Sequence, residues 1–316
     1  MKTFDGRVIK AVASKFFVDT DEGVKVCFAR KKLKSAGNIF VGDYVTVAKD
    51  RDSFVIEEVK PRTNQLIRPY VSNIDVCFIV VACEPQPDFM LVDKIIVNCL
   101  EQRITPVLVK NKCDIFDVFD ALDICDVALT EQLDICNVAL TEQLDIFNAA
   151  LSEYKDIIQI VECSAENLMG IDALAQIAKG KTVCFAGQSA VGKSSLINAM
   201  LGSDVLQVGE LAKKIKRGKN TTRRTEILSL GSDTYLVDTC GFSMLEAIDI
   251  PPENLRLYYD DFEQFRPMCK FSACTHIDEP DCAVKPHVGR EIGSGRYQRY
   301  KALFEELKQR RDTKYD

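Results

Sequence analysis

A glycine-rich segment in the second half of the 316-residue chain has the residue types that bind phosphate groups. Residues 187–194 read Gly-Gln-Ser-Ala-Val-Gly-Lys-Ser, which fits the pattern G-x-x-x-x-G-K-S/T in full. The segment lies between a strand-like run and a helix-like run, where backbone N–H groups at a helix start can surround phosphates. Lys193 would reach the terminal phosphates, and the Ser194 hydroxyl would bind Mg²⁺. The predicted nucleotide contacts are Gly187, Gln188, Ser189, Ala190, Val191, Gly192, Lys193, Ser194 and Ser195.

A second motif indicates which base is bound. Residues 111–114 read Asn-Lys-Cys-Asp, and the Asp114 carboxylate can accept two hydrogen bonds from a ring N–H and an exocyclic amine that guanine has and adenine lacks. We expect Asn111 to orient this loop and contact the base, and the Lys112 stem to cover the ring. Ser164 and Ala165 support this interpretation, since the Ala165 N–H would face the guanine carbonyl oxygen. The two motifs predict GTP or GDP as the ligand.

Asp238 begins a third segment, Asp-Thr-Cys-Gly at 238–241, which follows a strand-like run. Its carboxylate is expected to hold Mg²⁺ through water, while the Gly241 N–H would sense the γ-phosphate. Thr222 is expected to supply the switch hydroxyl and a further Mg²⁺ contact. In Ras-like enzymes a glutamine directly after the glycine orients the attacking water, but Phe242 stands there in this chain. Slow intrinsic turnover is therefore expected.

The order of these motifs is reversed relative to ordinary GTPases, in which the phosphate loop comes first. Here the guanine motifs at 111–114 and 163–165 precede the phosphate loop at 187–194. The same sheet can be cut in one loop and rejoined elsewhere with its strands in the same places. The sequence therefore predicts a circularly permuted GTPase, in which segment 238–241 leads directly into the C-terminal region.

That region contains Cys269, Cys274, His276 and Cys282 within 14 residues. Three thiolates and one imidazole suit a closed tetrahedral structural site, so we expect one Zn²⁺ per chain. The alternative is four unrelated core residues. His287 is the only other histidine and is expected at the surface. Most of the remaining cysteines lie singly in apolar runs, which is typical of reduced, buried thiols.

Periodicity divides the chain into three predicted domains. Five short strand-like runs before residue 60 fit an all-β barrel of the oligonucleotide-binding type (OB-fold) that binds RNA, over residues 1–64. Apolar strands alternating with helices then predict an α/β P-loop circularly permuted GTPase domain over residues 65–248. Residues 249–316 would form a small α-helical zinc-binding domain. The basic loop 30–34 of the barrel is either a solvated turn or a phosphate contact.

The final helix, expected at 296–314, carries several basic residues that are either solvated or in contact with RNA. They are Arg296, Arg299, Lys301, Lys308, Arg310 and Arg311.

An 11-residue repeat at 122–151 interrupts the predicted GTPase domain. Its apolar residues recur at spacings of three and four, which predicts one apolar stripe along an extended surface helix. The stripe is expected either to pack on the GTPase sheet or to mediate self-association. We expect no chemistry from this insertion, because it lies between the motifs.

The net charge of −6 is unevenly distributed. Residues 69–180 carry 6 basic and 19 acidic residues, whereas residues 1–68 carry 14 and 9, so the acidic segment leaves the rest free to face a polyanion. The longest apolar run, 76–83, is too short to cross a bilayer, and the N-terminus has no apolar signal core. We expect a cytoplasmic monomer with no membrane partner.

A barrel, a permuted GTPase and a zinc module in this order resemble the ribosome-small-subunit-dependent GTPase A family (RsgA, also YjeQ). The resemblance covers essentially the whole chain and includes Cys-Ala-Val-Lys at 282–285 and the residues Arg296, Tyr297 and Tyr300. It implies a bacterial factor that binds the small (30S) ribosomal subunit and its rRNA late in maturation. It also implies that GTP hydrolysis is stimulated by that subunit.

The chain departs from this family at the predicted hydrolytic site. The family usually has a histidine before its paired threonines, and Asn220 stands there; an amide can orient water but cannot take up a proton near neutral pH. The catalytic contribution is therefore sought among Thr222, Asn220 and Gly241. Two alternatives are a non-catalytic GTP-dependent RNA-binding switch and a structural zinc protein with an inactive nucleotide site. The intact Lys193 and Asp114 oppose the second alternative.

Overall fold

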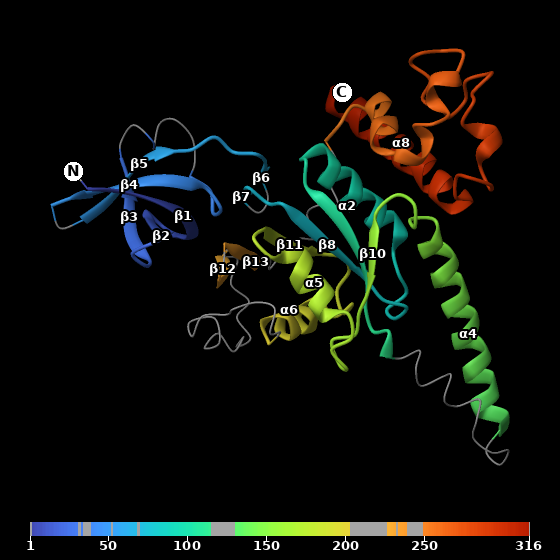
Figure 1. The fold of residues 1–316 in the computed structure, drawn as a ribbon. Coiled ribbons are helices and arrows are strands. Elements are labelled where there is room, and N and C mark those ends of the chain that lie inside the picture. Colours follow the sequence, from blue (N-terminus) through green and yellow to red (C-terminus); the bar gives the residue numbers. More distant parts are fainter. Residues whose placement is uncertain are drawn as a thin grey trace.

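Figure 1 shows three bodies in the computed structural model, with a barrel and a C-terminal module on opposite sides of a central α/β unit. The structure describes residues 2–30, 33, 39–51, 53–67, 70–114, 130–202, 226–231, 233–238 and 249–315. Within these ranges, no helix is long and apolar enough to span a membrane.

The N-terminal strands close into a barrel, as the sequence predicts. Strand β1 pairs with both β2 and β4, and β3 pairs in parallel with β5, so the sheet has no open side. Side chains alternate along each strand, which places Val8, Val18 and Ile56 in a fully buried centre. The strands are β1 (Thr3–Val12), β2 (Lys15–Thr20), β3 (Lys25–Ala29), β4 (Tyr44–Asp50) and β5 (Ser53–Val59).

A short hairpin that the sequence does not signal follows the barrel. Strands β6 (Gln65–Ile67) and β7 (Tyr70–Ser72) pair with each other in a separate two-stranded sheet. Asn64 fastens the start of this hairpin, because its side-chain amide donates to the Ile74 carbonyl at 2.7 Å and accepts from the Ile74 N–H at 2.9 Å. The hairpin therefore makes a tight joint between the barrel and the central unit.

The central sheet has the strand order β10-β9-β8-β11-β13-β12, parallel except for β12. Every side chain of β8 is buried, and alternate residues enter two cores: Cys77 and Ile79 face the side covered by α2, and Phe78 and Val80 face α5 and α6. This confirms the predicted parallel sheet with two covered faces. The elements are β8 (Val76–Val81), α2 (Phe89–Glu101), β9 (Thr105–Lys110), β10 (Gln159–Glu162), α5 (Ile171–Ala178), β11 (Thr182–Ala186), α6 (Lys193–Leu201), β12 (Glu226–Gly231) and β13 (Thr234–Asp238).

Helix α4 (Thr130–Ser152) carries most of the repeat, from residue 130 on, and extends away from the central unit in Figure 1. Phe147 and Leu151 of the apolar stripe are buried in the core beside α2, and Leu144 packs against the same core. Ile146, which lies off the stripe, is 70% exposed. The stripe thus packs on the GTPase domain at its C-terminal end. Residues 115–129, which include the start of the repeat at 122–129, lie outside the described residues.

The C-terminal module consists of short 3₁₀ turns that pack on one long helix. Its core is strongly aromatic, with Tyr259, Phe262 and Tyr300 in mutual contact, and Val97 of α2 also belongs to that core. The elements are η2 (Pro252–Tyr258), η3 (Asp260–Phe262), η4 (Arg266–Met268), η5 (Lys285–His287) and α8 (Ser294–Tyr315).

Two basic residues of α8 are neither solvated nor available to RNA, so that expectation is wrong for them. Arg296 is 1% exposed, and its guanidinium lies 2.7 Å from Asp93 of α2 and 3.3 Å from Asp261. Arg299 also binds Asp93, at 2.6 Å, and Glu153 at 3.0 Å. Burial disfavours the charged guanidinium, but Asp93 and Asp261 more than offset this and raise the pKa of Arg296. This ionic cluster joins the module to α2.

We predict that Asp93→Ala lowers the free energy of unfolding by about 3–5 kcal/mol, because it leaves two buried guanidinium groups without their shared partner. Urea denaturation of the full chain measures this. Lys94→Ala is the matched control: Lys94 also reaches α8, through Glu306 at 2.7 Å, but this pair is more exposed, and we expect a loss of less than about 1 kcal/mol. Equal losses for both variants would show that burial of the cluster is unimportant.

Candidate functional site

The predicted phosphate loop lies between β11 and α6, at the carboxyl edge of the parallel sheet. Gly187 has φ +119°, and a Cβ there would lie 2.2 Å from the Val80 carbonyl oxygen. Gly192 has φ +95°, and a Cβ there would lie 2.2 Å from the Asn111 Nδ2 atom. Both glycines are therefore required by sterics as well as by their left-handed backbone. The loop can pack against β8 and the guanine motif only with glycine at these two positions.

Lys193 bends back over the phosphate loop. Its ammonium group donates to the Gly187 carbonyl at 2.8 Å and also to the Gln188 carbonyl. Burial lowers the pKa of Lys193. A phosphate placed beside the amine would act in the opposite direction, because a negative charge favours the protonated form. Ser194 and Ser195 follow in the first turn of α6 and are exposed, whereas Val191 is buried.

Asn111 connects the predicted guanine motif to the phosphate loop. Its side chain is 1% exposed, and Nδ2 donates to the Val191 carbonyl at 2.8 Å. The Oδ1 atom is buried with no hydrogen-bond partner in the described part of the chain. The two motifs, 76 residues apart in sequence when counted from Asn111 to Gly187, therefore form one continuous site.

Asp114 is held by Ser164, which the sequence predicts to be a nucleotide contact. The buried Ser164 hydroxyl donates to Asp114 Oδ1 at 2.5 Å and accepts from the N–H groups of Glu166 and Asn167. The Cys113 N–H donates to the Cys163 carbonyl at 3.1 Å, which joins the same two loops. This arrangement orients the carboxylate before any base binds, and it makes Ser164 a support for Asp114.

The loop between β8 and α2 also borders the site, which the sequence motifs do not indicate. Lys112 Nζ donates to the Glu84 carbonyl at 2.8 Å. The Gln188 side chain accepts from the Asp88 N–H at 2.9 Å and donates to the Gln86 carbonyl at 3.2 Å. Backbone groups make most of these contacts, so no side-chain motif in this loop could have signalled them.

The predicted Mg²⁺ ligands are only partly among the described residues. Asp238 is the last residue of β13, which pairs with β11, so its backbone lies at the sheet edge that carries the phosphate loop. Ser194 lies at the start of α6 on the same edge. Thr222, Asn220 and Gly241 lie outside the described residues.

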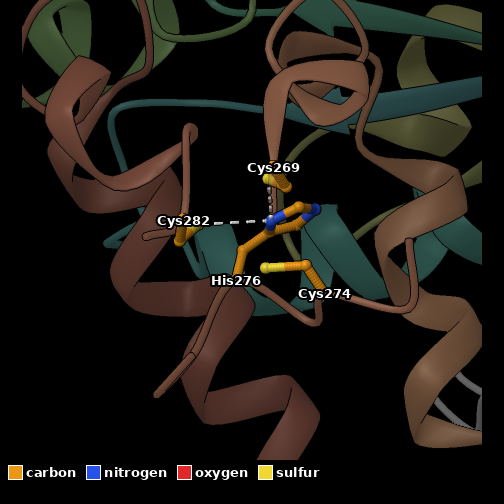
Figure 2. A group of neighbouring side chains, drawn as sticks. All are labelled: Cys269, Cys274, His276 and Cys282. Atoms are coloured by element: carbon orange, nitrogen blue, oxygen red, sulfur yellow. Dashed lines mark hydrogen bonds between the residues drawn. The ribbon is translucent and has the colours of Figure 1, made fainter. Parts of the chain in front are cut away.

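Cys269, Cys274, His276 and Cys282 converge on one point in the C-terminal module, as Figure 2 shows. Their ligand atoms all lie within 4.8 Å of one another. His276 Nδ1 is 3.6 Å from Cys269 Sγ and 3.4 Å from Cys282 Sγ. A tetrahedral zinc with ordinary bond lengths would separate a sulfur and a nitrogen ligand by roughly 3.6 Å. The four residues fit this metal in number, type and spacing.

The surroundings of the cluster also suit a metal. Burial lowers the pKa of His276 to about 4, so its imidazole is in the neutral, ligating form. Burial also raises the pKa of Cys274 to about 12, because it disfavours the charged thiolate. A bound cation would stabilise that thiolate. Tyr297 and Tyr300 donate to the carbonyls of His276 and Thr275, which fixes the turn that carries the histidine.

The sequence predicts His287 at the surface, but the residue is only partly exposed. Its ring is half-buried and stacks on Phe265 with centroids 3.6 Å apart, and Nδ1 lies 3.0 Å from Glu291. It takes no part in the metal cluster.

Comparison with known proteins decides the family. A family model described as RsgA GTPase matches residues 59–248, more than half of the chain. The chain belongs to the RsgA GTPase family. A protein of Caldanaerobacter subterraneus named "Small ribosomal subunit biogenesis GTPase RsgA" is 35% identical over 320 residues, which cover 100% of this chain and 99% of that protein. The protein of the same name from Thermotoga neapolitana is 37% identical and covers 92% and 91%.

Solved structures agree with this assignment. The crystal structure of YjeQ from Thermotoga maritima is similar with a TM-score of 0.75 and 32% identity, covering 97% of this chain and 99% of that one. YloQ, titled a circularly permuted GTPase, is similar with a TM-score of 0.72 and 29% identity, covering 98% and 96%. The resemblance seen in the sequence and the predicted fold class are thereby confirmed.

We predict that Asp114→Asn weakens GTP binding by more than about tenfold, because a charge-assisted contact to the base is worth about 1.5–3 kcal/mol. Ser164→Ala should weaken binding less, since the carboxylate stays but loses its orienting donor. Fluorescence titration with a labelled GTP analogue measures both. Unchanged affinity in Asp114→Asn would remove this residue from base recognition.

We predict about one zinc per chain, measured by elemental analysis of protein purified without chelator. Cys282→Ala should abolish this zinc and unfold the C-terminal module while GTP binding persists. Cys184→Ala is the control, because Cys184 is a buried cysteine of the sheet outside the cluster. Protein without zinc would contradict the metal assignment.

Proposed function

We propose that this chain is a GTPase that binds the small (30S) ribosomal subunit, acts late in its maturation and hydrolyses GTP to GDP and phosphate at a rate the subunit raises. The observation that carries the proposal is the joined nucleotide site, in which Asn111 ties the guanine motif to the phosphate loop and Ser164 orients Asp114. The printed names of the relatives, which specify small-subunit biogenesis, support the partner.

The proposed ligands follow from the same site. GTP or GDP would contact the phosphate loop, Asn111, Lys112, Asp114 and Ala165, with Ser164 behind the aspartate. Mg²⁺ would be held by Ser194, Thr222 and Asp238 and would neutralise charge on the transferred phosphate. One Zn²⁺ would occupy the cluster of Cys269, Cys274, His276 and Cys282 and stabilise the C-terminal module.

The barrel is the proposed contact to rRNA. Residues 1–68 carry an excess of basic residues, and the barrel exposes the apolar side chains of Val26, Phe28 and Tyr44, the last of them 45% exposed. Cations that follow a phosphate backbone and rings that stack on bases are the usual components of such a surface. We further propose that the chain acts as a monomer, with domains at 1–64, 65–248 and 249–316.

We predict that hydrolysis is slow without small subunits and faster with them, because Phe242 cannot orient water and Asn220 cannot accept a proton. If Asn220 is a weaker substitute for an imidazole, Asn220→His raises the rate and Asn220→Ala lowers it. Phosphate release by all three proteins, alone and with purified small subunits, measures this.

Two outcomes of that assay would count against the proposal. Equal rates for wild type, Asn220→His and Asn220→Ala under both conditions would show that residue 220 takes no part in hydrolysis. Turnover that stays negligible with small subunits present would favour a non-catalytic GTP-dependent RNA-binding switch.

A further inference from the structure

Strand β1 of the barrel contributes to two hydrophobic cores. Val8 is fully buried among the barrel residues. Ile9 and Ala11 instead pack against the core of the central unit, which contains Ile227 of β12 and Val237 of β13. The strand therefore seals the barrel and also covers the hairpin formed by β12 and β13.

The strand register brings β1 close to the predicted Mg²⁺ ligand. Lys10 of β1 pairs with Glu226 of β12, and Glu226 pairs in turn with Asp238 of β13. Neighbouring strands lie about 4.8 Å apart, so the backbone of Asp238 is only two strand spacings, roughly 10 Å, from the barrel. The side chains of Lys10 and Glu226 form an ion pair at 2.8 Å, partly exposed to solvent.

Arg7 lies at the other end of the contact between the barrel and the β12–β13 hairpin. Its guanidinium donates to Thr182 Oγ1 at 2.6 Å, to the Asn73 carbonyl at 2.9 Å and to the Gly42 carbonyl at 3.2 Å, and the side chain is 2% exposed. Arg7 thus contacts both the end of the β6–β7 hairpin and the start of β11, the strand that leads to the phosphate loop.

On the β12–β13 hairpin, the residue that contacts Arg7 is Tyr235 of β13. The Arg7 guanidinium lies 4.5 Å from the Tyr235 ring centroid and 4.9 Å from that of Tyr44. Tyr235 is three residues before Asp238, so its anchoring limits where the end of β13 can lie.

We propose that Arg7 and Lys10 of the barrel are positioning residues for the GTPase site, which set the place of Asp238 through the β12–β13 hairpin and so tune the affinity for Mg²⁺. The inference rests on the proposed role of Asp238 as a magnesium ligand. A merely structural interface would change stability with barrel mutations but leave the magnesium dependence of nucleotide binding unchanged.

The test is the Mg²⁺ concentration that half-maximally slows release of a fluorescent GDP analogue from the full chain. Glu226→Lys and Lys10→Glu each place two like charges opposite one another across β1 and β12, which separates the strands. We expect the half-maximal Mg²⁺ concentration to rise at least roughly threefold in each single variant, which corresponds to the free energy of an ion pair of this exposure. The double variant, with the pair reversed, should return towards wild type.

The two single variants also separate positioning from direct electrostatics. Lys10→Glu adds negative charge near the metal, so a through-space effect would strengthen Mg²⁺ binding, whereas lost positioning weakens it. Glu22→Lys is the matched control, because it breaks the pair with Lys2 at 2.6 Å on the barrel surface, outside the pairing of β1 with β12. Arg7→Lys is a second test of positioning, because it keeps the positive charge but loses the three hydrogen bonds of the guanidinium.

Three results would overturn the inference. A wild-type magnesium dependence in Glu226→Lys, Lys10→Glu and Arg7→Lys would show that the barrel does not position the site. Opposite shifts in the two charge reversals, which would cancel in the double variant, would assign the effect to charge alone. Wild-type protein that binds the GDP analogue without any influence of Mg²⁺ would instead refute the role of Asp238 in the proposed function, and this inference with it.

Discussion

The parallel register of β8, β9, β11 and β13 is the constraint on which the nucleotide site depends. It brings the ends of these strands to one edge, where Asn111, Gly187 and Asp238 begin the three motifs. Chain order does not enter this geometry, so a permuted sequence builds the same site. What permutation changes is the chain order: β12 and β13 now lead along the sequence from the phosphate loop to the C-terminal module, while β12 pairs in space with the barrel.

The two flanking modules are attached by different physical means. The barrel is joined by strand pairing, by apolar packing of Ile9 and by a single buried arginine. The C-terminal module is joined by the ionic cluster around Asp93, in which two guanidinium groups share one carboxylate. A buried ionic cluster has a strict geometry and gains little over apolar packing in free energy. It therefore specifies one orientation of the module on α2.

Motifs with fixed spacing were predictable from the sequence because their chemistry is local. The phosphate loop lies within residues 187–194 and the metal cluster within residues 269–282; the first lies before a helix and the second brings its four residues together, as expected. Long-range contacts were not predictable in the same way. Arg296 and Arg299 look like surface residues, because nothing near them in sequence shows that Asp93, about two hundred residues earlier, is buried opposite them. Strand β12 was not predicted, and its importance comes from its pairing with β1 and β13.

Helix α2 gives the ionic cluster a connection to the nucleotide site. Asp88 caps the start of the helix by accepting from the Leu91 N–H at 3.0 Å, and its own N–H is held by Gln188 of the phosphate loop at 2.9 Å. Asp93 lies little more than one turn further on, where it binds α8. Helix α2 therefore holds the phosphate loop at its start and the C-terminal module little more than one turn later. The barrel is linked to the site through strands β12 and β13 and the module through this helix, so the two modules connect to the nucleotide site by separate elements.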